Sequence, residues 1–239
     1  MKKALFLLLI LPAISNAQFK DILAKAAEKI NAVKSNNSLD ISAGLKEALN
    51  KGVTEQVSKL TKTDGFYKNE AVKILMPEEL AKLDKTLRKM GMSKLADEGI
   101  LALNRAAEDA VKEATPIFVT AIKNITITDA KGILLGNENA ATLYLQSATT
   151  TPLYAKFNPV VQKSIGKVGA DIIWTKIIKQ YNTIPFVTKV NPDLTDYVTN
   201  KALDGVFKMI TIEEKNIRTN LNARTSDVLK KVFALQDKK

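Results

Sequence analysis

Apolar residues recur at helical spacing along most of the chain, and the longest such run lies between Lys94 and Asn124. Its apolar positions advance by alternating steps of three and four and form one stripe, made of Leu103, Ala107, Ala110, Ala114, Phe118 and Ala121. Because alanine side chains are short, a neighbouring helix can approach this stripe closely. We therefore expect an alanine-rich central helix with partners on more than one side, kinked or broken near Pro116.

Other segments have the same spacing, and they predict helices over residues 19–34, 40–62, 77–90, 128–135, 139–150, 150–180, 193–218 and 227–236. Thr128 is expected to cap the helix that follows it, and Pro152 to open the long one. The apolar residues between 66 and 76 fit the spacing of a short helix and that of an extended segment equally well. We interpret these residues as a packed connector after the turn at Asp64-Gly65. The sequence thus predicts an all-α fold, a multi-helix bundle of about eight to ten helices, several of them short.

The N-terminus has the features of a cleavable signal peptide over residues 1–17. Two lysines precede an apolar core that is too short to cross a bilayer, and small residues follow a helix-breaking proline. Cleavage between Ala17 and Gln18 would make the mature protein periplasmic or secreted. We expect residues 18–38 to form an N-terminal helix and linker and residues 39–239 a single helical domain, with no transmembrane segment in the mature chain.

The chain contains no histidine and no cysteine. This excludes histidine-based triads, thiol nucleophiles, the usual zinc sites and iron–sulfur ligation. No glycine-rich phosphate loop, EF-hand spacing or serine elbow is present either. We therefore expect no cofactor and no metal site.

The net charge is +11, and loss of Lys2 and Lys3 with the signal peptide lowers it to +9. A basic surface attracts anionic envelope components such as phospholipid head groups, lipopolysaccharide or cell-wall polymers. The lysines are scattered, however, which favours a general role in solubility. Nucleic-acid binding is not expected, because basic and aromatic residues do not interleave. We expect a monomer.

Two groups of polar residues are candidates for a site. Asn104, Arg105 and Glu108 share one helical turn and could clamp a ligand, but an ion pair that fixes helix packing is the favoured interpretation. Glu214 falls inside an apolar helical face and needs a cation such as Arg218, four residues later. A metal site would require Glu108 and Glu214 to converge; a single buried network joining both groups is our preferred hypothesis.

Aromatic residues gather in the second half of the chain, including Tyr181 and Tyr197. They could line a pocket for an apolar small ligand beneath a loop over residues 181–192. At helical spacing, core packing is the more common role.

Several stretches resemble a known family: GLKEALNKGV from Gly44, MPEEL from Met76, LNRAAEDA from Leu103, PIF from Pro116, TITDAKGIL from Thr126, AAT from Ala140, YVTNKALDGVF from Tyr197, then EEKNIR and ARTSDVLKKVF. Together they are similar to the bacterial exported family known as domain of unknown function 4197, collinearly from about Leu39 to Phe233. The resemblance implies an exported, mostly helical domain and supplies no catalytic residues.

Two classes of function follow from these observations. The first is a non-enzymatic binding or interaction module of the cell envelope, for an apolar ligand, lipid or cell-wall material. The alternative is a carboxylate-dependent hydrolase or transferase, using Mg²⁺ or Ca²⁺, since glycosidase-type chemistry needs only two acids. No second acid at the required separation is identifiable from the sequence.

Overall fold

The computed structural model describes residues 38–76, 93–167 and 193–237, with isolated positions between 85 and 91 and between 171 and 189. These residues form seven α-helices and one short 3-10 helix: α2 (Ser38–Leu60), α4 (Ser93–Val111), α5 (Ala114–Lys123), α6 (Ile127–Leu135), α7 (Ala140–Gly166), α9 (Leu194–Thr219), η2 (Leu221–Ala223) and α10 (Asp227–Phe233). The described part contains no strand, which confirms the all-α class. Its helices are fewer than the eight to ten expected; the predicted helix over 19–34 and most of that over 77–90 lie outside the described residues.

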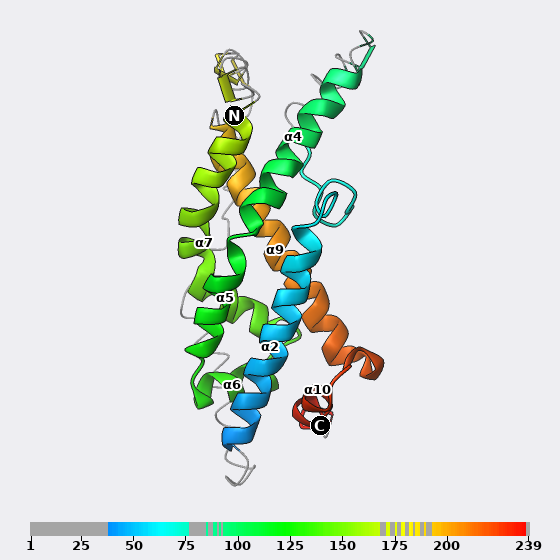
Figure 1. Ribbon diagram of the computed structural model, residues 1–239, viewed down its shortest axis with the longest axis vertical. Helices are drawn as coiled ribbons and strands as arrows, with labels where there is room; N and C mark the ends of the chain where they lie inside the picture. Colours follow the sequence, from blue (N-terminus) through cyan, green and yellow to red (C-terminus); the bar gives the residue numbers. More distant parts are fainter. Residues whose placement is uncertain are drawn as a thin grey trace, which may run out of the picture.

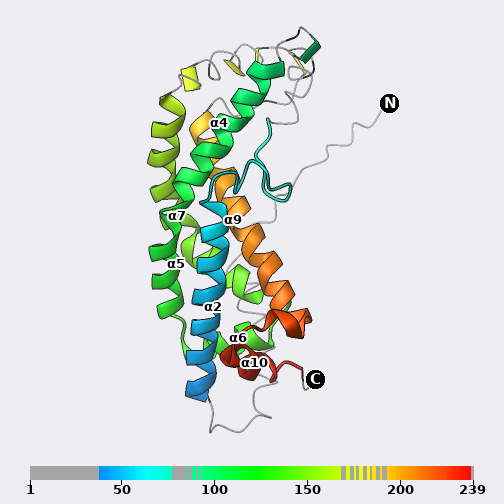
Figure 2. The ribbon, with the colours of Figure 1, turned by 45° about the vertical axis from the view of Figure 1, so that its right-hand side comes forward.

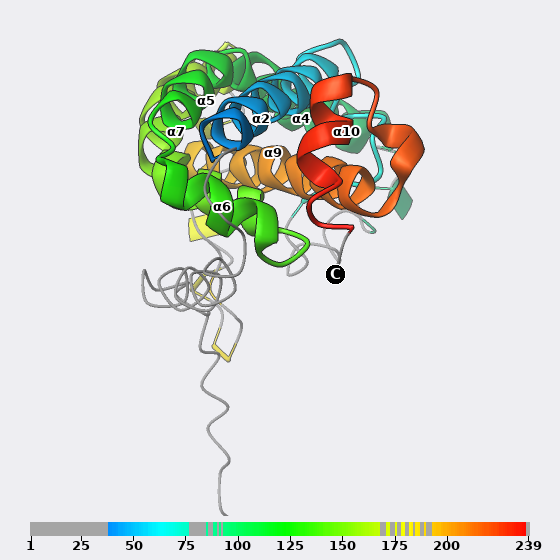
Figure 3. The same cartoon turned by 90° about the horizontal axis from the view of Figure 1, so that it is seen from below.

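The helices form an elongated bundle along which α9 runs obliquely (Figure 1). α9 packs against α7, α4 and α2, and α7 also packs against α4 and α5. Seen from below, α2 is enclosed at its end of the bundle by α5, α6, α9 and α10 (Figure 3). Figure 2 shows α6 and α10 together at this end. The central position is therefore shared: α4 packs against α7 and α9, so it has more than one partner as predicted, and α2 and α9 also pack against several helices.

Three α-helices are capped by the side chain of their own N-cap residue. Thr126 caps α6 through a reciprocal capping box with Asp129, Asp193 caps α9 and Ser226 caps α10. The expected cap at Thr128 is wrong: the cap is Thr126, two residues earlier, because Thr126 and Asp129 have the spacing at which each side chain bonds the other's backbone N–H.

The predicted break near Pro116 is confirmed, but it falls earlier. α4 ends at Val111 and α5 begins at Ala114, so that Pro116 lies within the first turn of α5. A proline at this position removes no hydrogen bond, because the first N–H groups of a helix have no intrahelical acceptor.

The helix expected over 139–150 and the first part of that expected over 150–180 are one helix, α7, which passes through Pro152 and Pro159 and ends at Gly166. Several residues between 168 and 180 lie outside the described part of the chain. Its buried face continues across Pro152, with Leu145 and Leu153 both inaccessible to solvent. Burying such side chains stabilises the fold by about 1.5–3 kcal/mol each, enough to offset the cost of about 3 kcal/mol for an interior proline.

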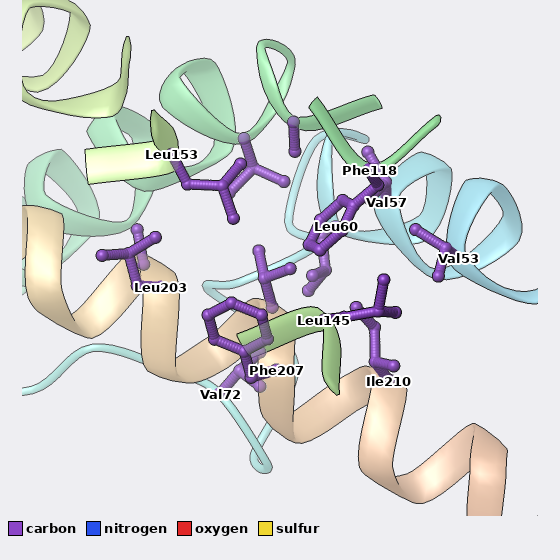
Figure 4. Packing of buried hydrophobic residues seen from close by; sticks show 14 of the residues in the cluster. Val53, Val57, Leu60, Val72, Phe118, Leu145, Leu153, Leu203, Phe207 and Ile210 are labelled. Atoms are coloured by element: carbon purple, nitrogen blue, oxygen red, sulfur yellow. The ribbon is translucent and has the colours of Figure 1, made fainter. Parts of the chain in front are cut away.

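The core lies where α2, α5, α7 and α9 meet (Figure 4). Phe118 of α5 meets Phe207 of α9 edge to face, with ring centroids 6.0 Å apart. The alanine stripe is fully buried at Ala107, Ala110 and Ala114, so the stripe faces the core as predicted.

Candidate functional site

The first predicted group lies on α4, where Glu108 and Arg105 hold the connector that follows α2. Glu108 is buried, and its Oε1 accepts hydrogen bonds from the backbone N–H groups of Phe66, at 3.0 Å, and Tyr67, at 3.3 Å. Its Oε2 accepts a 2.6 Å hydrogen bond from Nη1 of Arg105. The Glu108 carboxylate is thus fixed by three donors of the protein itself.

Asn104 and Tyr197 hold the other end of the same connector. The Asn104 side chain accepts a hydrogen bond from the backbone N–H of Ile74 and donates one to the carbonyl of the same residue, both at 2.8 Å. It thereby satisfies both backbone groups of Ile74. Tyr197 of α9 donates its hydroxyl proton to the carbonyl of Leu75 at 2.8 Å. These contacts hold the segment between α2 and α4, which includes the packed connector expected over residues 66–76, between α4 and α9.

Asp64 completes this group and was noted in the sequence only as a turn residue. Its φ of 69° is left-handed, which aspartate tolerates better than most residues. Arg105 donates to its carboxylate at 2.6 Å and Lys68 at 2.8 Å, and the hydrogen bond from Lys68, followed by that from Arg105, lowers the Asp64 pKa. Asp64 and Arg105 lie 41 positions apart, and a single sequence does not indicate that two such residues will pair.

The second predicted group joins the end of one helix to the start of another. Glu214, buried on α9, accepts hydrogen bonds from the backbone N–H groups of Ala141, at 2.9 Å, and Thr142, at 2.8 Å, and from the Thr142 hydroxyl at 2.8 Å. Asn139, the residue in the N-cap position of α7, forms no capping hydrogen bond. Glu214 therefore caps α7 from another helix and places its negative charge at the positive end of the α7 dipole.

Arg218 performs the complementary task at the end of α6. Its Nη2 donates to the Ile133 carbonyl at 2.7 Å and to Glu214 at 2.8 Å, and its Nη1 donates to the Leu134 carbonyl at 3.0 Å. A cation at a helix C-terminus is favourable, and the Arg218 side chain is only 2% exposed. The predicted Glu214–Arg218 pair is confirmed, and it secures the α6–α7 turn.

Arg224 extends this group towards the C-terminus. It donates to the carbonyls of Ile217 and Arg218 and forms an ion pair with Asp237, whose pKa is lowered by the hydrogen bond from Arg224. Both Arg218 and Arg224 lie over the ring of Phe233, 5.7 and 5.6 Å from its centroid. The last helix is thereby attached to the end of α9.

The hypothesis of one network joining the two groups is wrong. Arg105 bonds Glu108 and Asp64, whereas Arg218 bonds Glu214, α6 carbonyls and Gln236. Each group closes on its own backbone partners, and Glu108 and Glu214 do not converge. No group of three or more acidic residues that could hold a metal ion occurs in the described part of the chain.

A small cavity of about 30 Å³ adjoins the Glu214 group, lined by residues of α2, α6, α7, α9 and α10 that include Gly52, Ile210, Glu213 and Phe233. That volume admits a water molecule but lies far below the roughly 300–1,000 Å³ of ligand pockets. Glu213 accepts a 2.9 Å hydrogen bond from Gln56, and burial, followed by the charge of Glu55, raises the Glu213 pKa.

A larger hollow, which we call the α4–α7 groove, lies on the surface and has a volume of about 470 Å³. It is lined by Asp109, Lys112, Pro159, Val160, Lys163, Ser164 and Lys167. Sequence reasoning missed it, because its lysines lie at the ends of two helices that only the fold brings together.

The structure describes only some of the aromatic residues in the second half of the chain, which were predicted to line a pocket. Tyr181 lies outside the described residues, Tyr197 is bound to the connector, and Phe157 is fully buried in the core. The Phe186 side chain is fully exposed.

Comparison with protein families gives one match, to "Protein of unknown function (DUF4197)", over residues 35–234. The chain belongs to the DUF4197 family. The match spans both polar groups, the α4–α7 groove and the connector, and it agrees with the resemblance seen in the sequence. No curated protein and no solved structure matches this DUF4197 chain.

None of the helices in the described residues is long and apolar enough to span a membrane.

Proposed function

We propose that this DUF4197 protein is a non-enzymatic binding or interaction module of the cell envelope, exported to the periplasm or secreted. One observation carries the proposal: the buried charges singled out in the sequence are engaged by the protein itself. Glu108 and Glu214 accept from backbone N–H groups and from an arginine, and Arg218 donates to backbone carbonyls. Side chains held in this way stabilise helix ends and a connector.

The alternative, a carboxylate-dependent hydrolase or transferase, requires acids that face a substrate or a metal ion. Glu108 and Glu214 are 4% and 7% exposed and face the interior of the bundle. Their surroundings therefore argue against a catalytic role for these two residues.

The charge distribution supports an anionic ligand over an apolar one. The expected net charge after signal removal is +9, and three of the seven residues that line the α4–α7 groove are lysines. The cavity beside Glu214, with a volume of about 30 Å³, is too small for an apolar ligand larger than a few atoms. Phospholipid head groups, lipopolysaccharide and cell-wall polymers all have the required negative charge.

Export rests on the lysine-rich start, the short apolar core and the small residues before Gln18. Intact-mass measurement on the periplasmic fraction of an expressing bacterium tests it. We expect a chain that begins at Gln18; an exported chain that retains Met1 would contradict cleavage.

A thermal-shift screen of the mature chain tests the class of function. Ligands that bind the native state raise the unfolding temperature, so we expect a shift with anionic lipid vesicles or cell-wall fragments and none with Mg²⁺ or Ca²⁺. A large metal-specific shift that disappears in Glu108→Gln or Glu214→Gln would favour the enzyme instead.

A further inference from the structure

The lysines of the α4–α7 groove are unequally paired. Lys112, near the end of α4, forms a 2.8 Å ion pair with Asp109, which also accepts a 3.3 Å hydrogen bond from the Ser164 hydroxyl. The hydrogen bond from Lys112 is the main reason why the Asp109 pKa is lowered. Lys163 and Lys167 are exposed and form no ion pair within the described part of the chain. The charge of Lys167 also contributes to lowering the Asp109 pKa. Three lysines against one carboxylate leave the groove with a net charge of +2.

Helix stability alone does not account for this arrangement. Lys163, in the last turn of α7, and Lys167, in the C-cap position, interact favourably with the helix dipole. Two lysines four residues apart repel each other, however, by about 0.2–0.5 kcal/mol. Lys156 is also exposed and lies seven residues before Lys163, on the same side of α7. The dipole effect has faded two turns from the helix end, so Lys156 gains nothing from it.

We propose that the α4–α7 groove binds a phosphate group, a proposal that rests on the binding function inferred above. A phosphate ester carries one to two negative charges and several acceptor oxygens, which match the ammonium groups of Lys163 and Lys167. The groove is larger than a phosphate ion alone, and Pro159 and Val160 give it an apolar part. This leaves room for the carbon skeleton beside the phosphate, as in a lipid head group; free phosphate has the same recognition chemistry.

The test compares wild type with Lys163→Gln/Lys167→Gln. Lys208→Gln/Lys231→Gln is the matched control, because it removes the same charge from exposed positions on α9 and α10. Titration with inorganic phosphate, followed by NMR shifts of backbone amides, reports the free ion. Cosedimentation with phosphatidylglycerol vesicles, against neutral phosphatidylcholine vesicles, reports the lipid source. Sulfate at equal ionic strength measures binding that depends on charge alone.

We expect phosphate or phosphatidylglycerol to bind wild type and the control alike, with the largest amide shifts around Ser164. The groove variant should bind at least about tenfold more weakly, which corresponds to about 1.4 kcal/mol. Equal loss in the control variant, equal binding of sulfate, or no binding of either phosphate source would overturn the proposal. If another ligand still shifts the unfolding temperature in the screen, the binding function stands and only its assignment to the groove fails.

Discussion

Replacing Glu214 by alanine removes the one acceptor that serves both the start of α7 and the Arg218 guanidinium. Five donor contacts end on this carboxylate: the N–H groups of Ala141 and Thr142, the Thr142 hydroxyl, and Nε and Nη2 of Arg218. Alanine would leave a buried cation without its partner and two helix N–H groups without an acceptor. Breaking a buried pair from one side costs about 3–5 kcal/mol, and we expect the free energy of unfolding to fall by that amount.

Urea denaturation measures this loss. Glu138→Ala is the control, because Glu138 forms an ion pair with Lys215 in which both side chains are more than half exposed, and such pairs contribute under about 1 kcal/mol. A double-mutant cycle should give strong coupling between Glu214 and Arg218, and less than about 0.5 kcal/mol between Glu214 and Arg105, which belongs to the other group. A Glu214→Ala loss no larger than that of the control would refute the capping role.

Three further predictions concern packing and charge. Ala107 is fully buried, so Ala107→Leu should overpack the α4 interface and lower the free energy of unfolding by about 1–3 kcal/mol; a urea midpoint equal to wild type would contradict this. A Cβ at Gly205 would lie 2.6 Å from a ring carbon of Phe66, whereas at Gly52 the nearest atom would be 3.9 Å away. Gly205→Ala should therefore destabilise by about 1–3 kcal/mol and Gly52→Ala stabilise by about 0.5–1, and thermal melts with the opposite order would disprove the packing argument. Burial, followed by the charge of the neighbouring Glu55, raises the pKa of Glu213 in the folded protein. The protonated side chain therefore stabilises the fold at a pH below the pKa of the unfolded state, and this stabilisation is lost as the pH rises through the pKa of the folded state. Glu213→Gln should accordingly gain stability relative to wild type between about pH 4 and 7, and a difference that does not change with pH in urea melts would exclude this linkage.

The helical pattern was readable from the sequence because apolar spacing is a local property. The burial of Glu214 and its pairing with Arg218 were also predictable, since an acid inside an apolar face needs a nearby cation. The continuity of α7 was not, because burial of Leu145 and Leu153 by other helices outweighs the local effect of Pro152.

The backbone partners of the candidate residues were equally hidden. Glu108 bonds the N–H of Phe66, and Glu214 that of Ala141, 42 and 73 positions away. Every residue except proline has a backbone N–H group, so no pattern of residue types indicates which N–H group will be the partner. The α4–α7 groove was missed for a related reason: Lys112 and Lys163 approach each other only after α4 packs against α7.

The most direct test of the central claim is to measure stability and ligand affinity together in Glu108→Gln and Glu214→Gln. The ligand is the one that gives the largest shift in the screen, and the titration is run at a temperature at which both variants remain folded. If these acids serve the fold, each variant should unfold at lower urea concentration and bind with the dissociation constant of wild type. A variant that keeps wild-type stability and binds at least about tenfold more weakly, a loss of about 1.4 kcal/mol, would show that its carboxylate contacts the ligand.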